Sequence, residues 1–191
     1  MRTLVIATNN QNKVKEIQKL LDSSILLKTL KDIGCDEELP ENQDTLEGNA
    51  LEKAQYVADH YGVDCFADDT GLLVDALSGA PGVYTARYAG PQRDANDNMN
   101  LLIKNLQSES NRKARFVTVM ALVENGESKT FEGVCEGAIS LKMSGAKGFG
   151  YDPVFIPEGY DVTFAEMELS EKNKISHRGR AVQKLVAYLN Q

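Results

Sequence analysis

A short apolar segment at the N-terminus, followed at once by a polar turn, constrains the fold of this chain more than any other feature. Leu4-Val5-Ile6-Ala7 continues into Thr8-Asn9-Asn10, which predicts a strand over Arg2–Ala7 that ends in a turn. The apolar residues that follow recur at helical spacing, and they are Val14, Ile17, Leu20 and Leu21. A strand, a turn and a helix in this order are typical of α/β folds.

Three further helices are predicted from apolar stripes. One covers about residues 45–61, and Gly62 stands where a left-handed C-terminal cap is expected. The second covers Asp94–Leu106. The last, at the C-terminus, carries Ala181, Val182, Leu185, Val186 and Leu189.

A β-hairpin is predicted in the second half of the chain. Arg115–Glu124 alternates enough to form a strand, Asn125-Gly126 is the strongest short hairpin signal, and Lys129–Val134 is the return strand. Helix-separated strands early in the chain and a hairpin later predict an α/β fold with a mixed, twisted sheet flanked by helices.

Length and charge restrict the class of protein. A chain of 191 residues fits one domain over residues 1–191. Its 21 lysines and arginines stand against 28 aspartates and glutamates, a net charge of −7. Because binding to DNA or RNA rests on a basic surface, this balance argues against a nucleic-acid polymer as partner, while a single small anion stays compatible.

Cysteine and histidine usage excludes further classes. The three cysteines are far apart and form no Cys-x-x-Cys pair, and there are only two histidines. This pattern argues against a disulfide framework and a zinc site and fits a reducing compartment. No apolar segment approaches the roughly 20 residues of a membrane span, and the first strand is too short for a signal peptide. We expect a cytoplasmic protein that does not contact a membrane.

The polar turn Thr8–Lys13 leaves a strand and opens a helix. The first amides of a helix have no partner within it and lie at the positive end of its dipole, so this turn can bind a phosphate, with Lys13 adding a full charge. The alternative is an ordinary helix N-cap followed by a solvated lysine, because the turn lacks the glycines of a Walker motif.

Two adjacent carboxylates, Asp68 and Asp69, interrupt an apolar segment, and a glycine turn follows at Gly71. At a strand end, alternation would point them to opposite faces, so that one faces a cleft, where it can take Mg²⁺ or deprotonate water. An Asx-type turn formed by Asp-Asp-Thr-Gly is the equally open alternative.

An acidic segment before the second helix supplies another carboxylate. Glu41 lies in this segment and is a candidate second metal ligand, although a solvated glutamate is the ordinary alternative. Lys53, within the helix, would ordinarily face solvent. It gains interest from its nearness to Glu41, because a metal-bound triphosphate also needs cations for its remaining negative charge.

The segment Ser144–Pro153 combines three glycines with Phe149 and Tyr151. Glycines let a backbone approach a ligand closely, and an aromatic ring beside them can stack on a base. The segment predicts a nucleobase pocket, with a structural loop that buries Phe149 in the core as the alternative.

A second group of donors stands just before the final helix. Lys172 is followed by Ser176-His177-Arg178-Gly179, and an arginine is a fixed donor suited to a purine O6 or a phosphate. A cluster of exposed charge at a helix start is the alternative.

These segments, in this order along nearly the whole chain, resemble the inosine/xanthosine triphosphate pyrophosphatase family. The resemblance rests on seven motifs: Ala7-Thr8-Asn9-Asn10-x-x-Lys13, Glu41-Asn42, Gly48-Asn49-Ala50-x-x-Lys53-Ala54, Ala67-Asp68-Asp69-Thr70-Gly71-Leu72, Pro81-Gly82-Val83-Tyr84-x-Ala86-Arg87-Tyr88, Gly148-Phe149-Gly150-Tyr151-Asp152-Pro153 and Ser176-His177-Arg178-Gly179.

The resemblance implies a Mg²⁺-dependent hydrolase of acid anhydrides. Such an enzyme converts ITP, dITP and XTP to the monophosphate and pyrophosphate and so removes deaminated purines from the nucleotide pool. The resemblance further implies an elongated, two-lobed α/β domain with a central substrate cleft, and a homodimer.

Site residues follow from the same resemblance. Asp69 would accept the proton from water and, with Glu41, hold Mg²⁺. Thr70 would contact the substrate where many relatives have serine. The phosphates would be bound by Thr8, Asn9, Asn10, Gln11, Asn12, Lys13 and Lys53, and the base by Phe149, Gly150, Tyr151, Asp152, Lys172, His177 and Arg178.

The predicted chemistry agrees with these residues. Hypoxanthine and xanthine carry a carbonyl at position 6 where adenine carries an amine, so a donor such as Arg178 would accept the former and reject the latter. Two other functions stay open. One is a pyrophosphatase for other modified nucleotides, and the other is a regulator that binds a triphosphate without hydrolysing it.

Overall fold

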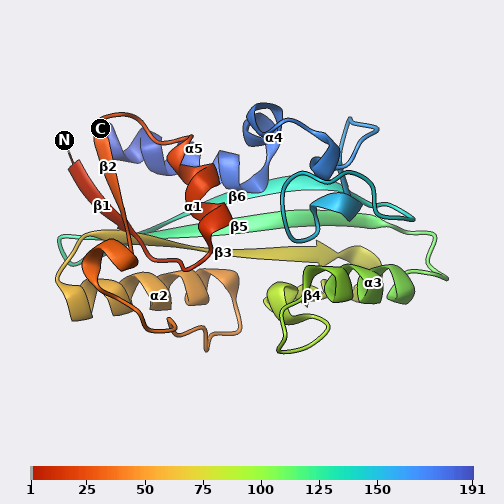
Figure 1. Cartoon of the computed structure of the whole chain (residues 1–191), viewed down its shortest axis with the longest axis horizontal. Coiled ribbons are helices and arrows are strands. Elements are labelled where there is room, and N and C mark those ends of the chain that lie inside the picture. Colours follow the sequence, from red (N-terminus) through yellow and green to blue (C-terminus); the bar gives the residue numbers. More distant parts are fainter. Residues whose placement is uncertain (1) are drawn as a thin grey trace. The chain divides into compact units, whose positions relative to one another are not determined.

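Parallel and antiparallel strands occur in one sheet (Figure 1). The computed structural model describes residues 2–191. The strands are β1 (Arg2–Ile6), β2 (Ile25–Thr29), β3 (Cys65–Val74), β4 (Pro81–Gly82), β5 (Lys113–Glu124), β6 (Glu127–Ile139) and β7 (Phe155–Pro157). The α-helices are α1 (Gln11–Gln18), α2 (Leu46–Tyr61), α3 (Ala95–Asn105), α4 (Leu169–Ile175) and α5 (His177–Leu189).

The strand order confirms the predicted mixed α/β class. It is β2-β1-β3-β5-β6-β7, with β4 paired to β3. β1 runs parallel to β2 and to β3, whereas β4 is antiparallel to β3, and β7 to β6. The turn between β5 and β6 has positive φ at both Asn125 and Gly126, as a two-residue hairpin requires.

The chain forms two compact units. Unit 1 consists of Met1–Asp69, Thr118–Gly133 and Arg178–Gln191, and unit 2 of Thr70–Val117 and Val134–His177. β3, β5 and β6 each contribute residues to both units. A single domain over residues 1–191 stays a prediction.

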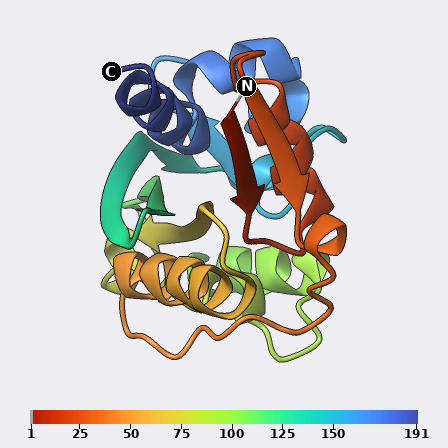
Figure 2. The same cartoon turned by 90° about the vertical axis from the view of Figure 1, so that its left-hand side faces the viewer.

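Helices cover both faces of the sheet in unit 1. Figures 1 and 2 show α2 on one side, with α1 and α5 on the other. On the side of the sheet that faces α1 and α5, the strands and these helices pack through a buried apolar cluster. It includes Leu4, Ile6, Ile17, Phe66, Val182 and Leu185. α2 starts at Thr45, whose hydroxyl accepts from the amide of Gly48 at 3.0 Å, and ends at Gly62 with φ 63°. The predicted C-terminal cap at Gly62 is therefore confirmed, and the structure adds an N-cap at Thr45.

Unit 2 has its own core. β3, β5, α3 and the segments around β7 supply it, and its buried residues include Leu72, Val74, Leu102, Phe116, Phe155 and Phe164. Asp94, the first residue of the predicted helix, is the N-cap of α3, and its carboxylate accepts from the amide of Asp97 at 2.9 Å.

Several boundaries differ from the prediction. α1 ends at Gln18, so Leu20 and Leu21 lie beyond the helix, and the amides of both donate to the carbonyl of Ile17. His177 and Arg178 form the first turn of α5 and do not precede it. β2, β7 and α4 were not predicted, because their segments are short and carry no long apolar period.

The largest difference concerns the paired carboxylates. They do not lie at a strand end, because β3 continues to Val74 and Gly71 lies within it. Beyond Gly71 the strand is kept extended by hydrogen bonds to residues later in the sequence. Leu72 pairs with Gly82 of β4, and its amide donates to the hydroxyl of Thr85 at 2.9 Å.

No helix within residues 2–191 has both the length and the apolar character needed to cross a membrane.

Candidate active site

Asp68 and Asp69 engage different partners from neighbouring positions of β3. The Asp68 side chain is fully buried, and its Oδ2 lies 3.0 Å from Lys13 Nζ and 3.4 Å from Arg178 Nε. Asp69 Oδ1 lies 3.4 Å from Lys53 Nζ. Successive side chains of a strand point to opposite faces, so these two carboxylates contact different cations and define two neighbouring charge clusters.

The first cluster is centred on Lys53. Its ammonium lies 2.7 Å from Glu41 Oε1, 3.4 Å from Asp69 Oδ1 and 2.9 Å from the carbonyl oxygen of Asp68. The side chain is 7% exposed, so Lys53 is not the solvated lysine that helices ordinarily carry. α2 projects it toward the loop of Glu41 and toward β3, and three predicted site residues thereby meet at one point.

The second cluster joins Lys13, Asp68, Arg178 and Glu16. Arg178 Nη1 lies 2.6 Å from Glu16 Oε2, and both side chains are buried. Glu16 was not among the predicted site residues. The sequence held one signal for it, since Glu16 lies next to Ile17 and three positions after Lys13, on the buried side of α1.

The two neighbouring aspartates are shifted in opposite directions. Burial alone would raise the pKa of Asp68, but Lys13 and Arg178 outweigh it and lower the pKa to about 2. Burial raises the pKa of Asp69, and the attraction of Lys53 and Lys13 does not cancel this effect. Asp68 is thus a fixed anion, whereas Asp69 is the better proton acceptor of the pair.

The two lysines also differ. Burial lowers the pKa of Lys13 in spite of Asp68. Burial would lower the pKa of Lys53 too, but Asp69 and Glu41 outweigh it and leave this pKa above its ordinary value. Lys53 therefore stays an ammonium group between two carboxylates.

The polar turn combines both readings of its sequence. Asn10 is the N-cap of α1, and its Oδ1 accepts from the amides of Asn12 and Lys13 at 3.0 and 3.4 Å. Thr8 Oγ1 accepts from the amide of Asn10 at 3.2 Å. Lys13 is only 14% exposed, so the cap is ordinary and the lysine is not solvated. Asn9, Gln11 and Asn12 are exposed.

In unit 2, Asp152 organises the predicted base-binding residues. Its Oδ2 lies 2.7 Å from Lys172 Nζ and accepts from the amide of Phe149 at 2.9 Å. The Lys172 ammonium lies 5.3 Å from the centre of the Phe149 ring and 5.5 Å from that of Phe164. A Cβ at Gly148 would overlap the Asp152 carboxylate, so this close approach requires glycine.

The other predicted residues of unit 2 lie in different surroundings. Tyr151 belongs to the core, and its hydroxyl donates to the carbonyl of Thr85 at 2.8 Å. The buried His177 ring stacks on Phe116, with ring centres 4.5 Å apart and an angle of 17° between planes. Thr70 and Gly150 are half-buried. The base-binding roles of these residues stay predictions.

Comparisons with known proteins agree with the predicted family. The sequence profile of the Ham1 family matches residues 4–188. This chain belongs to the Ham1 family. The dITP/XTP pyrophosphatase of Flavobacterium johnsoniae is 55% identical to it over 97% of both chains, and that of Christiangramia forsetii 52% over 98% of both. The solved structure of a Ham1 protein from Coxiella burnetii, 36% identical, matches with a TM-score of 0.92 over 100% of this chain and 99% of that one.

The carboxylates of this Ham1 family member fit a magnesium ion that also binds substrate. Among residues 2–191 there is no group of three or more His, Cys, Asp or Glu side chains suited to hold a metal by themselves. Mg²⁺, however, commonly takes only one or two protein carboxylates and completes its shell with water and substrate phosphates. Glu41 and Asp69, which both contact the Lys53 ammonium, supply oxygen donors of that kind.

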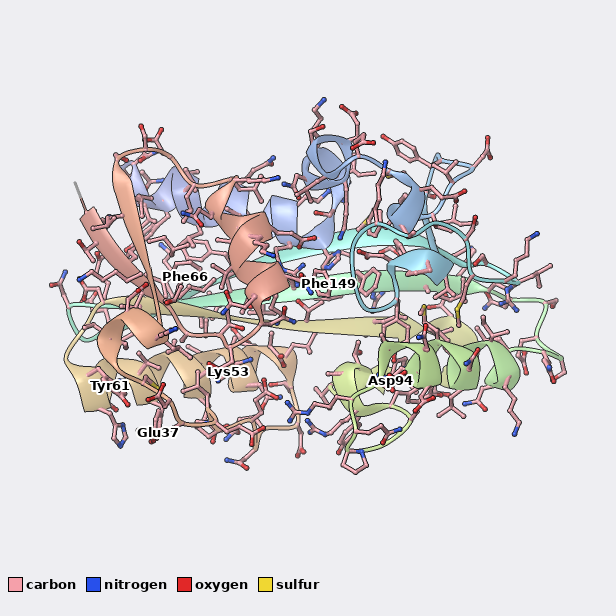
Figure 3. All side chains as sticks on the ribbon, viewed as in Figure 1. Glu37, Lys53, Tyr61, Phe66, Asp94 and Phe149 are labelled. Atoms are coloured by element: carbon pink, nitrogen blue, oxygen red, sulfur yellow. The ribbon has the colours of Figure 1, made fainter. Side chains whose placement is uncertain are left out.

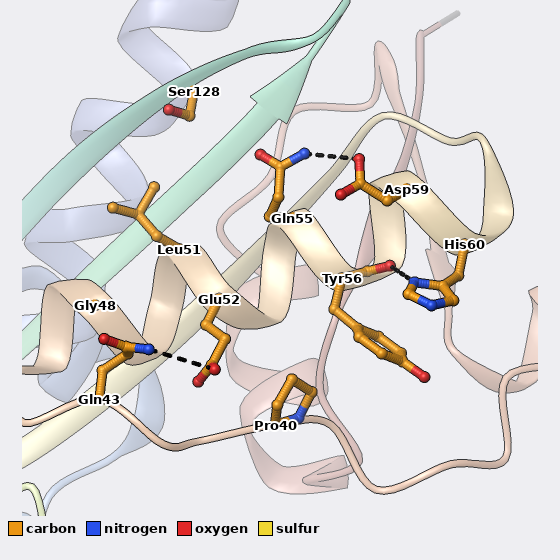
Figure 4. A pocket seen from close by; sticks show the side chains of 10 residues that line it. All are labelled: Pro40, Gln43, Gly48, Leu51, Glu52, Gln55, Tyr56, Asp59, His60 and Ser128. Carbon is orange, nitrogen blue, oxygen red and sulfur yellow. Dashed lines mark hydrogen bonds between the residues drawn. The ribbon is translucent and has the colours of Figure 1, made fainter.

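A pocket of about 670 Å³ in unit 1 of the Ham1 chain is lined by residues that belong to neither cluster (Figure 4). Its lining comes from the loop before α2, the outer side of α2 and the start of β6. The residues are Pro40, Gln43, Gly48, Leu51, Glu52, Gln55, Tyr56, Asp59, His60 and Ser128. None of them is a predicted site residue.

Proposed function

We propose that this chain is a nucleoside triphosphate pyrophosphatase that hydrolyses the deaminated purine nucleotides dITP, XTP and ITP to the monophosphate and pyrophosphate. The names of its curated relatives support the substrate class. The observation that carries the chemistry is the convergence of Glu41, Asp69 and Lys53 at one point. Two oxygen donors and a cation at one point are what hydrolysis of a metal-bound triphosphate requires.

Asp69 is proposed as the base that accepts the proton of the attacking water. Its position next to Lys53 and its raised pKa support this role. Glu41 and Asp69 would together hold Mg²⁺. When bound, Mg²⁺ supplies charge to the phosphate oxygens at the bond that breaks.

Lys53 and Lys13 are proposed to neutralise the triphosphate. Each already contacts a carboxylate, so each ammonium is held in place before a phosphate arrives. The turn Thr8–Asn12 adds the exposed side-chain amides of Asn9, Gln11 and Asn12 and the hydroxyl of the half-buried Thr8, and these groups can donate to phosphate oxygens. Thr70 follows Asp69 directly and is proposed to contact the substrate.

Residues of unit 2 are proposed to recognise the base, and the same role is proposed for Arg178. Phe149 would stack on the purine, and the Asp152–Lys172 pair beside it offers both an acceptor and donors. The remaining members of the group are Gly150, Tyr151 and His177. For Arg178, whose guanidinium contacts Glu16 and Asp68, a change in nucleotide selectivity on substitution would support the proposal.

We further propose that the enzyme works as a homodimer in the cytoplasm. A role in clearing deaminated purines from the nucleotide pool needs access to free nucleotides, and the acidic net charge of −7 fits a small-molecule substrate better than a nucleic-acid polymer.

The test is the identity of the products. ITP incubated with the protein and Mg²⁺ should give IMP and pyrophosphate, separated by ion-exchange chromatography, in equal amounts. Glu41→Ala should reduce the rate strongly, and added Mg²⁺ should recover part of it. IDP and inorganic phosphate as products would contradict cleavage between the α and β phosphates. Unchanged nucleotide bound to the protein would indicate a sensor.

A further inference from the structure

The loop that carries Glu41 is held by one face of α2. Residues 34–45, between the 3-10 turn Lys31–Ile33 and α2, contain no helix or strand, so side-chain contacts must set the position of this loop. On α2, four polar residues follow the spacing i, i+3, i+4 and i+7, which places them on one side of a helix. They are Asn49, Glu52, Lys53 and Tyr56, and each bonds to the loop.

Glu52 makes the contacts nearest to Glu41. Its Oε2 accepts from the backbone amide of Asn42 at 2.8 Å, and its Oε1 accepts from Asn42 Nδ2 at 3.2 Å. Oε1 also accepts from Gln43 Nε2 at 3.4 Å (Figure 4). One carboxylate thus binds both the backbone and the side chain of the residue that follows Glu41.

A second carboxylate holds the N-terminal part of the loop. Here the acceptor belongs to the loop and the donors belong to α2. Glu37 of the loop accepts from the hydroxyls of Tyr56 and Tyr61 of α2, the latter at 2.8 Å. Figure 3 shows Glu37 beside Tyr61 near the C-terminal end of the helix, and Lys53 closer to its N-terminal end. The Glu37 contacts do not involve Glu41 or Glu52, so we expect them to keep the loop attached when those of Glu52 are removed.

We propose that Glu52 is a positioning residue for the metal carboxylate Glu41. The hydrogen bond from the Asn42 amide fixes the peptide that joins residues 41 and 42, and this peptide determines where the Glu41 side chain begins. Lys53 then sets where it ends, through the 2.7 Å contact with Oε1. This inference rests on the proposed function, in which Glu41 helps to hold the metal.

The contact of Lys53 cannot replace that of Glu52. A lysine ammonium on a flexible stem attracts a carboxylate from many directions, so it does not fix the loop backbone. A carboxylate that accepts from both the backbone and the side chain of one residue restricts the peptide to one orientation. Partners of this kind, one step removed from a metal, orient the ligand before the metal binds.

The experiment measures metal binding directly. Mn²⁺, as a paramagnetic substitute for Mg²⁺, is titrated into the full chain with an ITP analogue that has a methylene group between the α and β phosphates. Free Mn²⁺ is followed by electron paramagnetic resonance. Glu52→Ala should raise the dissociation constant of Mn²⁺ by about tenfold. Glu52→Gln should raise it less, because its amide oxygen still accepts from the Asn42 amide.

Asp59→Ala is the matched control. Asp59 is an exposed carboxylate of the same helix that accepts from Gln55 Nε2 at 2.8 Å, so its removal takes a similar charge from α2 and leaves the loop contacts intact. Its dissociation constant for Mn²⁺ should equal that of the wild type. Thermal unfolding of each variant establishes that it is folded.

Glu41→Ala separates the two proposals. If Glu41→Ala loses Mn²⁺ binding and Glu52→Ala binds as tightly as the wild type, the positioning role is overturned and the proposed function stands. If Glu41→Ala binds Mn²⁺ like the wild type, the metal site of the proposed function is itself wrong. Weakened binding in Glu52→Ala, partly restored in Glu52→Gln, supports the positioning role.

Discussion

Removal of the Lys172 ammonium should destabilise the protein through its effect on one buried carboxylate. Lys172 Nζ lies 2.7 Å from Asp152 Oδ2, and the two side chains are 3% and 4% exposed. In Lys172→Met the side chain keeps a similar length and loses its charge. Asp152 would then be a buried anion without this cation, although it would still accept from the amide of Phe149.

The size of the effect follows from this burial. Loss of one partner of a buried ion pair costs about 3–5 kcal/mol. For a chain of 150–250 residues each kcal/mol lowers the melting temperature by about 2–4 °C, so Lys172→Met should lower it by about 10 °C. In the double variant Lys172→Met/Asp152→Asn no buried charge of the pair is left, and an asparagine oxygen can still accept from the Phe149 amide. Most of the loss should therefore be recovered, with a coupling energy of about 3 kcal/mol or more.

Scanning calorimetry of the four proteins of this double-mutant cycle is the assay. Lys174→Met is the matched control, because Lys174 pairs with Glu171 at the surface, with both side chains more than half exposed. Its effect should lie within about 0.5 kcal/mol of zero. Additive effects of Lys172→Met and Asp152→Asn, or a loss in Lys172→Met no larger than that in Lys174→Met, would refute the reasoning.

Three further predictions concern the carboxylates and their surroundings. Asp69→Asn should abolish turnover and still bind nucleotide, because an amide cannot accept the proton of the attacking water; a variant that keeps near wild-type turnover would contradict this. The pKa of Asp68 is lowered from 3.8 to about 2, so its contribution to stability is present above about pH 4 and is lost as the pH falls toward 2, a loss of about 2 kcal/mol. Urea unfolding between pH 5 and 2 should be less pH-dependent in Asp68→Asn, and equal profiles would disprove the assignment. Gly148→Ala should lower the melting temperature by several degrees, because its Cβ would overlap Asp152 at a positive φ; an unchanged value would show that the loop can move.

Local sequence patterns predicted the elements whose partners are close in the chain. α2 carries both its apolar stripe and its caps within residues 45–62, and the β5–β6 hairpin is set by Asn125-Gly126. The pattern Asp-Asp-Thr-Gly also suits a turn, so it predicts that β3 ends near Gly71. Its last residues are extended because they pair with β4 and Thr85, and no local pattern reports such pairing.

The candidate site shows the same division. Asp69, Glu41 and Lys53 could be named from the sequence, since each stands in a motif with a chemical reason. That these three side chains meet could not be predicted from the sequence, because it depends on how the loop of Glu41 lies on α2. The contact between Glu16 and Arg178 joins residues 162 positions apart, and only the folded chain brings them together.

The central claim is most directly tested by pyrophosphate release from a panel of nucleotides. ITP, XTP, GTP, ATP and dUTP are compared at equal concentration, each with and without Mg²⁺. The proposed chemistry predicts rapid, Mg²⁺-dependent release from ITP and XTP and little from ATP and dUTP. Equal rates with ATP, or release that does not depend on Mg²⁺, would contradict it.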